Sequence, residues 1–232
     1  MFCQSCGANV EQASAMCTQC GARQLSATSP AMNEIGDKVK ASSLDAIQVL
    51  KKLVANPVGG LATAYEDVGS GRALSAGTAL CIAFAIAAAI GVNFGASNFL
   101  GQLSMFTGSS SGLGGFLKTS LGALVLPSAI VAAVWAIRRI AGASAPLAAD
   151  VFVAGASLAP LGLALLLAGF LGLGNLEVAI LLLFFALTYL ILILYAGLTR
   201  LGGMKESVAA PAVPATLLVS AWLCKVVFAA SF

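Results

Sequence analysis

The stretch "VAILLLFFALTYLILILYAGL", residues 178–198, is apolar almost throughout and contains no charged side chain. A helix of about 20 apolar residues is long enough to cross the roughly 30 Å hydrocarbon core of a bilayer. Water is absent from that core, so a spanning segment has to satisfy its backbone hydrogen bonds internally, as a helix does. We therefore predict a transmembrane helix over residues 178–198.

Four more apolar stretches of similar length predict further spans at residues 73–94, 119–137, 151–172 and 207–228. Of the five stretches, only the last contains a charge, Lys225. Over the whole chain 59% of residues are hydrophobic and 9% are charged, whereas a soluble domain has about 25% charged residues. The predicted fold class is an all-α polytopic membrane protein with a five-span helical bundle in residues 73–232.

Most cations near the ends of the predicted spans fall on one side of the membrane. Lys38, Lys40, Lys51, Lys52 and Arg72 precede the first span, Arg138 and Arg139 follow the second, and Arg200 and Lys205 follow the fourth. The other side receives the uncharged loop "GASNFLGQLSMFTGSSSGLGG", residues 95–115, with Lys118 and Glu177 near it. Because Lys and Arg are enriched in cytoplasmic loops, this pattern predicts a cytoplasmic N terminus and an outside C terminus.

Two C-x-x-C pairs lie near the start of the chain, Cys3 with Cys6 and Cys17 with Cys20. Four thiolates form a closed tetrahedral site that suits a structural Zn²⁺ and leaves no position for a catalytic water. Residues 1–22 are too few to bury a core, so metal binding would supply their folding energy. We predict a zinc ribbon. An iron site of rubredoxin type and a redox dithiol stay open as alternatives.

The ribbon is followed by a predicted flexible linker at residues 23–33 and a juxtamembrane helical region at residues 34–72. Ile35, Val39, Ile47, Leu50 and Val54 recur near helical spacing among lysines, which predicts an amphipathic helix at the membrane surface. The run "NPVGG", residues 56–60, ends it. Residues 2–22 contain a single charge, which is acidic, so we expect the ribbon to contact protein and not nucleic acid.

The segment "LVANPVGGLATAYEDVGSGRALSAGTAL", residues 53–80, resembles the entry to the membrane domain of the Yip superfamily, the Rab/Ypt-interacting proteins and their bacterial relatives. The resemblance rests on Pro57, the short helix after it and the number of spans, and it covers residues 53–232. It implies five spans with a cytoplasmic N terminus. Bacterial proteins that look like this often pair a zinc ribbon with such a domain, which implies the bacterial cytoplasmic (inner) membrane.

Few residues in or beside the spans suggest chemistry. Lys225 is interpreted as reaching the interface near Trp222, and Glu66 and Asp67 as helix-start or surface carboxylates. The single polar residues are expected to form interhelical hydrogen bonds, the thiols to pack, the prolines to kink helices, and the G-x-x-x-G pair to allow close helix contact. These are Asn93, Asn98, Ser128, Ser157, Thr188 and Tyr189; Cys81 and Cys224; Pro127, Pro160, Pro211 and Pro214; and Gly91 with Gly95.

The chain has no histidine and shows no recognisable catalytic pair, so we expect no enzymatic activity and no catalytic residue. The function predicted is a membrane scaffold or adaptor that presents the zinc ribbon as a cytoplasmic docking module. The expected partners are the lipid bilayer and either another protein or a second copy of the chain. The alternative is a transporter or channel subunit with a path between kinked helices.

Overall fold

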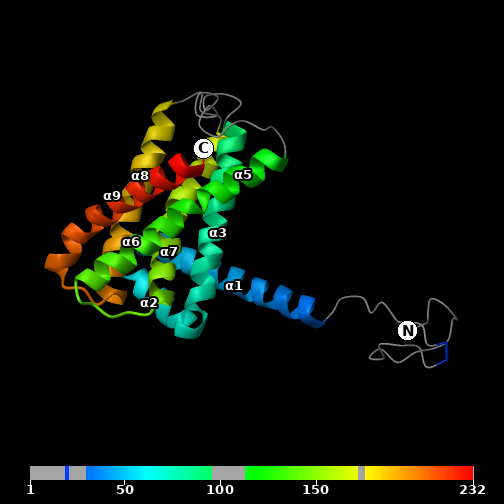
Figure 1. Cartoon of the computed structure of the whole chain (residues 1–232), viewed down its shortest axis with the longest axis horizontal. Coiled ribbons are helices and arrows are strands. Elements are labelled where there is room, and N and C mark those ends of the chain that lie inside the picture. The colour runs from blue at the N-terminus through cyan, green and yellow to red at the C-terminus, as the bar shows by residue number, and fades with distance from the viewer. Residues whose placement is uncertain (1–18, 21–29, 96–112, 172–175, 232) are drawn as a thin grey trace. The chain divides into compact units, whose positions relative to one another are not determined.

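The computed structural model describes residues 19–20, 30–95, 113–171 and 176–231, and these residues form helices and turns without strands (Figure 1). The chain divides into two compact units, Met1–Ala41 and Ser42–Phe232. The helices are α1 (Pro30–Ala55), α2 (Gly60–Val68), α3 (Ser70–Gly95), α5 (Leu113–Ala123), α6 (Val125–Ile140), α7 (Leu147–Phe170), α8 (Leu176–Ala196), the π-helical turn η1 (Gly197–Leu201) and α9 (Glu206–Ser231).

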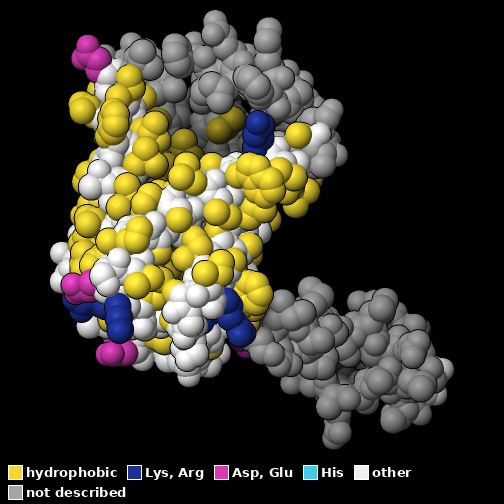
Figure 2. Space-filling model, turned by 60° about the vertical axis from the view of Figure 1, so that its left-hand side comes forward, with side chains coloured by type: hydrophobic (Ala, Val, Ile, Leu, Met, Phe, Trp, Pro, Cys, Tyr) yellow, Lys and Arg dark blue, Asp and Glu magenta, His cyan; other side chains and the backbone are white. Residues whose placement is uncertain are grey.

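Five helical segments are long and apolar enough to cross a membrane, which confirms that part of the predicted fold. They are Ser70–Asn93, Gly114–Ile140, Leu147–Phe170, Glu177–Leu201 and Glu206–Val227. On the face shown in Figure 2, hydrophobic side chains cover the middle of the bundle and most charged side chains lie toward its ends. This distribution suits a bilayer, because charges lie where headgroups and water can solvate them.

The second span consists of two helices, α5 and α6, which meet at Leu124. A proline has no N–H to donate, and its ring clashes with the carbonyl of the residue four positions earlier, which for Pro127 is Ala123. Helix α5 ends at Ala123. The chain re-forms a helix at once, because the Ser128 amide donates to the Leu124 carbonyl at 3.3 Å. Pro160, Pro211 and Pro214, in contrast, lie inside the continuous helices α7 and α9.

Helices α3 and α7 form the centre of the bundle. About half of each is buried, 50% and 56%, against 22% to 28% for the other three spans. Their backbones touch where glycines remove the side chains. A Cβ placed on Gly77 would lie 2.7 Å from the Phe152 Cα, and one placed on Gly169 would lie 2.6 Å from the Gly91 Cα. No side chain fits at such distances, so this glycine seam depends on residues without a Cβ.

The seam also fixes how α3 and α7 run relative to each other. Gly77 lies against Phe152, Phe84 against Gly162, and Gly91 against Gly169, so the contact moves forward along both helices together. The two helices are therefore parallel. The seam glycines of α7, residues 155, 162 and 169, recur every seven positions, the spacing that keeps one side of a helix against its neighbour. The close contact predicted at Gly91 is confirmed.

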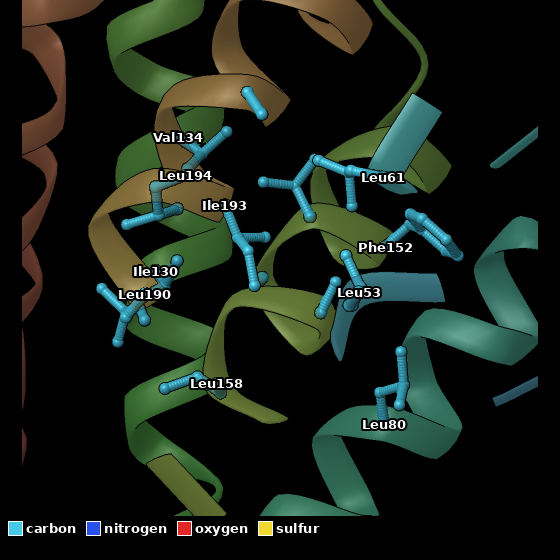
Figure 3. Close-up of a cluster of buried hydrophobic side chains, with 14 of the residues drawn as sticks. Leu53, Leu61, Leu80, Ile130, Val134, Phe152, Leu158, Leu190, Ile193 and Leu194 are labelled. Carbon is cyan, nitrogen blue, oxygen red and sulfur yellow. The ribbon is translucent and has the colours of Figure 1, made fainter. Parts of the chain in front are cut away.

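The part of α1 within the second unit packs into the bundle. Ala46, Val49 and Leu53 recur on one face and are buried, and Leu61 of α2 is buried beside them. Tyr65 of α2 meets Phe152 of α7 edge to face, with ring centroids 5.4 Å apart. Figure 3 shows Leu53 and Leu61 near Phe152, within the same buried cluster as Ile193 and Leu194 of α8.

The helix predicted to lie at the membrane surface therefore has, from Ser42 onward, one face covered by protein. The sequence pattern identified its helical period but not the partner of that face. Its opposite side, with Leu44, Ile47 and Val54, stays exposed. The helix begins at Pro30, inside the segment predicted as a linker, since proline is well tolerated at the first helical position. It continues through Ser42 and Ser43.

Candidate functional site

Arg138 of α6 and Asp150 of α7 form a buried ion pair. The Arg138 Nε donates to the Asp150 Oδ1 at 3.0 Å, and the Nη2 donates to the Oδ2 at 2.5 Å. The two side chains are 2% and 3% exposed. Two parallel bonds between a guanidinium and a carboxylate satisfy the charges of both groups and fix their relative orientation. The pair therefore holds the end of α6 against the start of α7.

The short loop between α6 and α7 brings the two charges together. Arg138 lies in the last turn of α6, and Asp150 lies in the first turn of α7, where each charge is favoured by the helix dipole. Between them the chain turns back, with Gly142 at φ 71° and the Ala143 amide donating to the Arg138 carbonyl at 3.1 Å. Arg138 also donates from Nη1 to the Ala143 carbonyl at 3.5 Å. The arginine thus joins both helices and the loop.

This pair offers structure and no evident chemistry, because the carboxylate is already engaged on both oxygens. Sequence reasoning assigned Arg138 to membrane topology only and did not select Asp150. The available signal was an arginine at the end of one span and a carboxylate at the start of the next, with a short loop that contains Gly and Pro between them. Such spacing can bring opposite charges together between two helices.

Two more ion pairs connect the juxtamembrane helices. The Arg72 Nη1 at the start of α3 donates to both carboxylate oxygens of Asp45 at 3.2 and 3.1 Å. Lys52 of α1 pairs with Asp67 of α2. Asp67 and its neighbour Glu66 lie in the last turn of α2 and are exposed, so of the two readings expected for them the surface one is confirmed and the helix-start one is wrong. A negative charge is disfavoured at that end of a helix, and the Lys52 ammonium offsets the effect for Asp67.

The polar side chains of the spans bond mainly to their own helices, which corrects the expectation of interhelical bonds. Asn93 donates to the Ala89 carbonyl at 2.7 Å, and Ser157 donates to the Ala154 carbonyl at 2.9 Å. Ser128, Thr188, Thr216 and Ser220 donate in the same way to the carbonyl four residues earlier. A hydroxyl satisfied within its own turn needs no partner helix. Asn98 lies outside the described residues.

The remaining candidates lie on three helices, α3, α8 and α9. Lys225 is exposed near the end of α9. Cys81 is buried in α3, while Cys224 in α9 is only half-buried. Tyr189 stacks at a tilt on Phe185, with ring centroids 4.7 Å apart.

The predicted zinc ligands fall mostly outside the structure's described residues. Cys3, Cys6 and Cys17 lie outside them, and Cys20 is exposed in a turn at residues 19–20. Within residues 19–20, 30–95, 113–171 and 176–231, no three metal-ligating side chains come together. The zinc ribbon stays a prediction from the C-x-x-C spacing.

Comparison with protein families, with curated proteins and with solved structures finds no match to this chain. The resemblance to the Yip superfamily therefore stays a prediction too.

Proposed function

We propose that the protein is a non-enzymatic scaffold or adaptor of the membrane, and that its N-terminal zinc ribbon is a docking module for a protein partner. The observation that carries the proposal is the glycine seam between α3 and α7. Gly91 lies so close to α7 that a Cβ on it would be 2.2 Å from the Leu165 carbonyl oxygen. Helices in backbone contact leave no room between them for a solute.

The polar side chains of the spans support the same proposal over a transporter. A transport path needs polar or ionisable groups that converge near the middle of the membrane. The hydroxyls of Ser157, Thr188, Thr216 and Ser220 are instead bonded to carbonyls of their own helices. The buried charges Arg138 and Asp150 neutralise each other at the end of the bundle. A rigid membrane anchor fits this arrangement better than a gated path.

The ribbon supplies the recognition part of the proposal. A closed four-cysteine site has no open metal position for catalysis, so its value is the folded surface that it creates. Attachment to a membrane anchor raises the effective concentration of that surface near other membrane proteins. A weak contact by the ribbon then adds to contacts made by the bundle.

The test is quantitative copurification of the full-length chain from its own membrane in mild detergent. Cys17→Ser removes one predicted zinc ligand, and Cys224→Ser is the matched control at a half-buried cysteine of α9. We expect the wild type and Cys224→Ser to retain the same partner. Cys17→Ser should lose it several-fold although the amount of inserted protein is unchanged.

Two results would count against the proposal. Equal recovery of every partner by all three proteins would remove the docking role of the ribbon. Flux of an ion or solute through purified protein in sealed vesicles would favour the transporter alternative, and with it a path that the seam between α3 and α7 does not close.

A further inference from the structure

A groove of about 800 Å³ lies between α3, α6 and α7, and its lining is almost wholly apolar. Each helix contributes apolar side chains to the lining, for example Ile82 of α3, Val131 of α6 and Val151 of α7. Its two hydroxyls are already used, since Thr78 donates to the Leu74 carbonyl and Ser128 to the Leu124 carbonyl, both at 2.8 Å. The groove offers contacts to a hydrocarbon and few to a polar ligand.

The length of the groove matches one leaflet of a bilayer. The residues of the second span that line the groove run from Leu124 to Trp135. At 1.5 Å per residue this stretch of helix is roughly 16 Å long. Half of a hydrocarbon core of roughly 30 Å is about 15 Å. The inner end of the groove lies at Leu124, where α5 and α6 meet, so the groove does not continue into the second leaflet.

A cation lies at the other end of the groove. The Arg139 guanidinium carbon is 5.6 Å from the centroid of the Trp135 ring, and Trp135 lines the groove. Asp150, the carboxylate in the first turn of α7, is paired with Arg138. The ion pairs seen in the described part of the chain do not include Arg139. A cation–π contact uses the charge of the guanidinium and none of its N–H donors, so these donors can match the oxygens of a phosphate.

We propose that this groove binds one acyl chain of an anionic phospholipid, with the lipid phosphate on Arg139 and the chain along α6 between Trp135 and Leu124. A second copy of the protein is a poorer fit. A transmembrane helix of a neighbour would cross both leaflets, and the groove accommodates one. An apolar groove that has a cation at the end nearer the membrane surface complements a lipid with a charged head and an apolar tail.

The test uses Trp135 as the reporter in the full-length chain. The chain has two tryptophans, so Trp222→Phe leaves Trp135 alone. The protein is reconstituted with either phosphatidylglycerol or phosphatidylcholine that is brominated near the top of the acyl chain, and quenching of fluorescence is titrated. We expect half-maximal quenching at about fivefold less phosphatidylglycerol, the preference that one basic residue confers near an anionic headgroup.

Substitutions separate the headgroup contact from the groove. Arg139→Gln should abolish the preference, Arg139→Lys should keep most of it, and Lys205→Gln, at an exposed cation outside the groove, should keep all of it. Ala132 lines the groove and is exposed, so Ala132→Phe should weaken quenching by both lipids. Leu121→Phe on α5, outside the lining, is the matched control and should not.

Equal quenching by the two lipids in the unsubstituted reporter would show ordinary annular lipid and overturn the proposal. Quenching by neither lipid would also overturn it, because another protein surface, such as a second copy, would then cover the groove. A preference that survives Arg139→Gln would place the headgroup contact elsewhere and contradict the assignment of Arg139.

Discussion

Arg138 and Asp150 form a two-bond ion pair that is almost completely removed from solvent, with N–O distances of 3.0 and 2.5 Å between α6 and α7. Removing two charges from water is costly, and their attraction compensates only while both are present. Loss of one partner leaves the other as an uncompensated buried charge. The pair therefore specifies how α6 meets α7 more than it adds to stability.

We therefore expect each single substitution in the pair to destabilise the protein more than the double substitution does. Arg138→Met or Asp150→Leu alone should lower the free energy of unfolding by about 3 kcal/mol, the usual cost of leaving half of a buried pair. The double variant Arg138→Met/Asp150→Leu should recover a large part of the loss. Unfolding in mixed detergent and SDS micelles measures it, with Arg200→Met, at an exposed arginine, as the control. Additive losses in the double variant would show that the two side chains are not coupled.

The glycine seam predicts that a single methyl group is harmful at Gly91 or Gly169. Alanine favours a helix by about 1 kcal/mol over glycine, but here its Cβ would overlap the backbone of the other helix. The free-energy cost of moving α3 away from α7 should exceed the gain in helix propensity. We expect a net destabilisation of the bundle by about 1–3 kcal/mol. The same unfolding assay measures the loss.

Gly71 provides the matched control, because a Cβ on it would meet nothing within 4 Å. Gly71→Ala should leave stability unchanged or raise it slightly. If Gly91→Ala were equally harmless, the close approach of α3 to α7 would be wrong.

Much of the fold could be predicted because a span needs only length and apolar composition, which local sequence records. The partner of each helix could not, since it depends on contacts between distant segments. Gly155, Gly162 and Gly169 have a readable seven-residue spacing, but they are three among 25 glycines, and nothing local names α3 as their partner. Pro127 explains why the second span is divided, yet Pro160 lies in a continuous helix, so a proline alone does not decide a break.

The candidate sites also include some that local sequence predicts and some that depend on contacts between distant segments. The C-x-x-C pairs can be interpreted from spacing because ligand geometry is local. The pair of Arg138 and Asp150 could not be ranked, because an arginine after a span is typical of a cytoplasmic loop whether or not it is buried. The amphipathic period of α1 was readable, but only the structure shows that Val49 and Leu53 face protein.

The doubled C-x-x-C spacing predicts about one zinc per chain by elemental analysis of the purified protein. Cys17→Ser should remove the metal, because a tetrahedral site with three thiolates binds it far more weakly. The five spans should stay inserted, since their helices satisfy their own backbones. Cys81→Ser, outside the predicted ligand set, should keep the zinc. Disulfides at Cys3, Cys6, Cys17 or Cys20 in protein from the reducing cytosol would contradict the prediction.

The placement of the cations predicts an outside C terminus. A reporter that is active only in the cytoplasm should be silent when it is fused after Phe232 and active when it is fused after Arg200, at the end of the fourth span. Activity after Phe232 would mean that the orientation or the number of spans is wrong.

The closed centre of the bundle is the claim on which the scaffold proposal rests, and a disulfide between α3 and α7 tests it most directly. A Cβ on Gly162 would lie 3.6 Å from the Cβ of Ala87, within the range of about 3.5–4.5 Å that a disulfide requires. The experiment uses Ala87→Cys/Gly162→Cys with a protease site inserted in residues 96–112, so that cleavage separates α3 from α7. Gly162→Cys alone reports on the other cysteines of the chain, and Ala87→Cys/Leu181→Cys places the second thiol on an exposed position of α8.

After mild oxidation and cleavage, the Ala87→Cys/Gly162→Cys protein should run as one band on a non-reducing gel and as two bands after reduction. The two control proteins should give two bands in both conditions. If Ala87→Cys/Gly162→Cys also separates into two bands without reduction, α3 and α7 are not in contact, and a path between them becomes the better account of this protein.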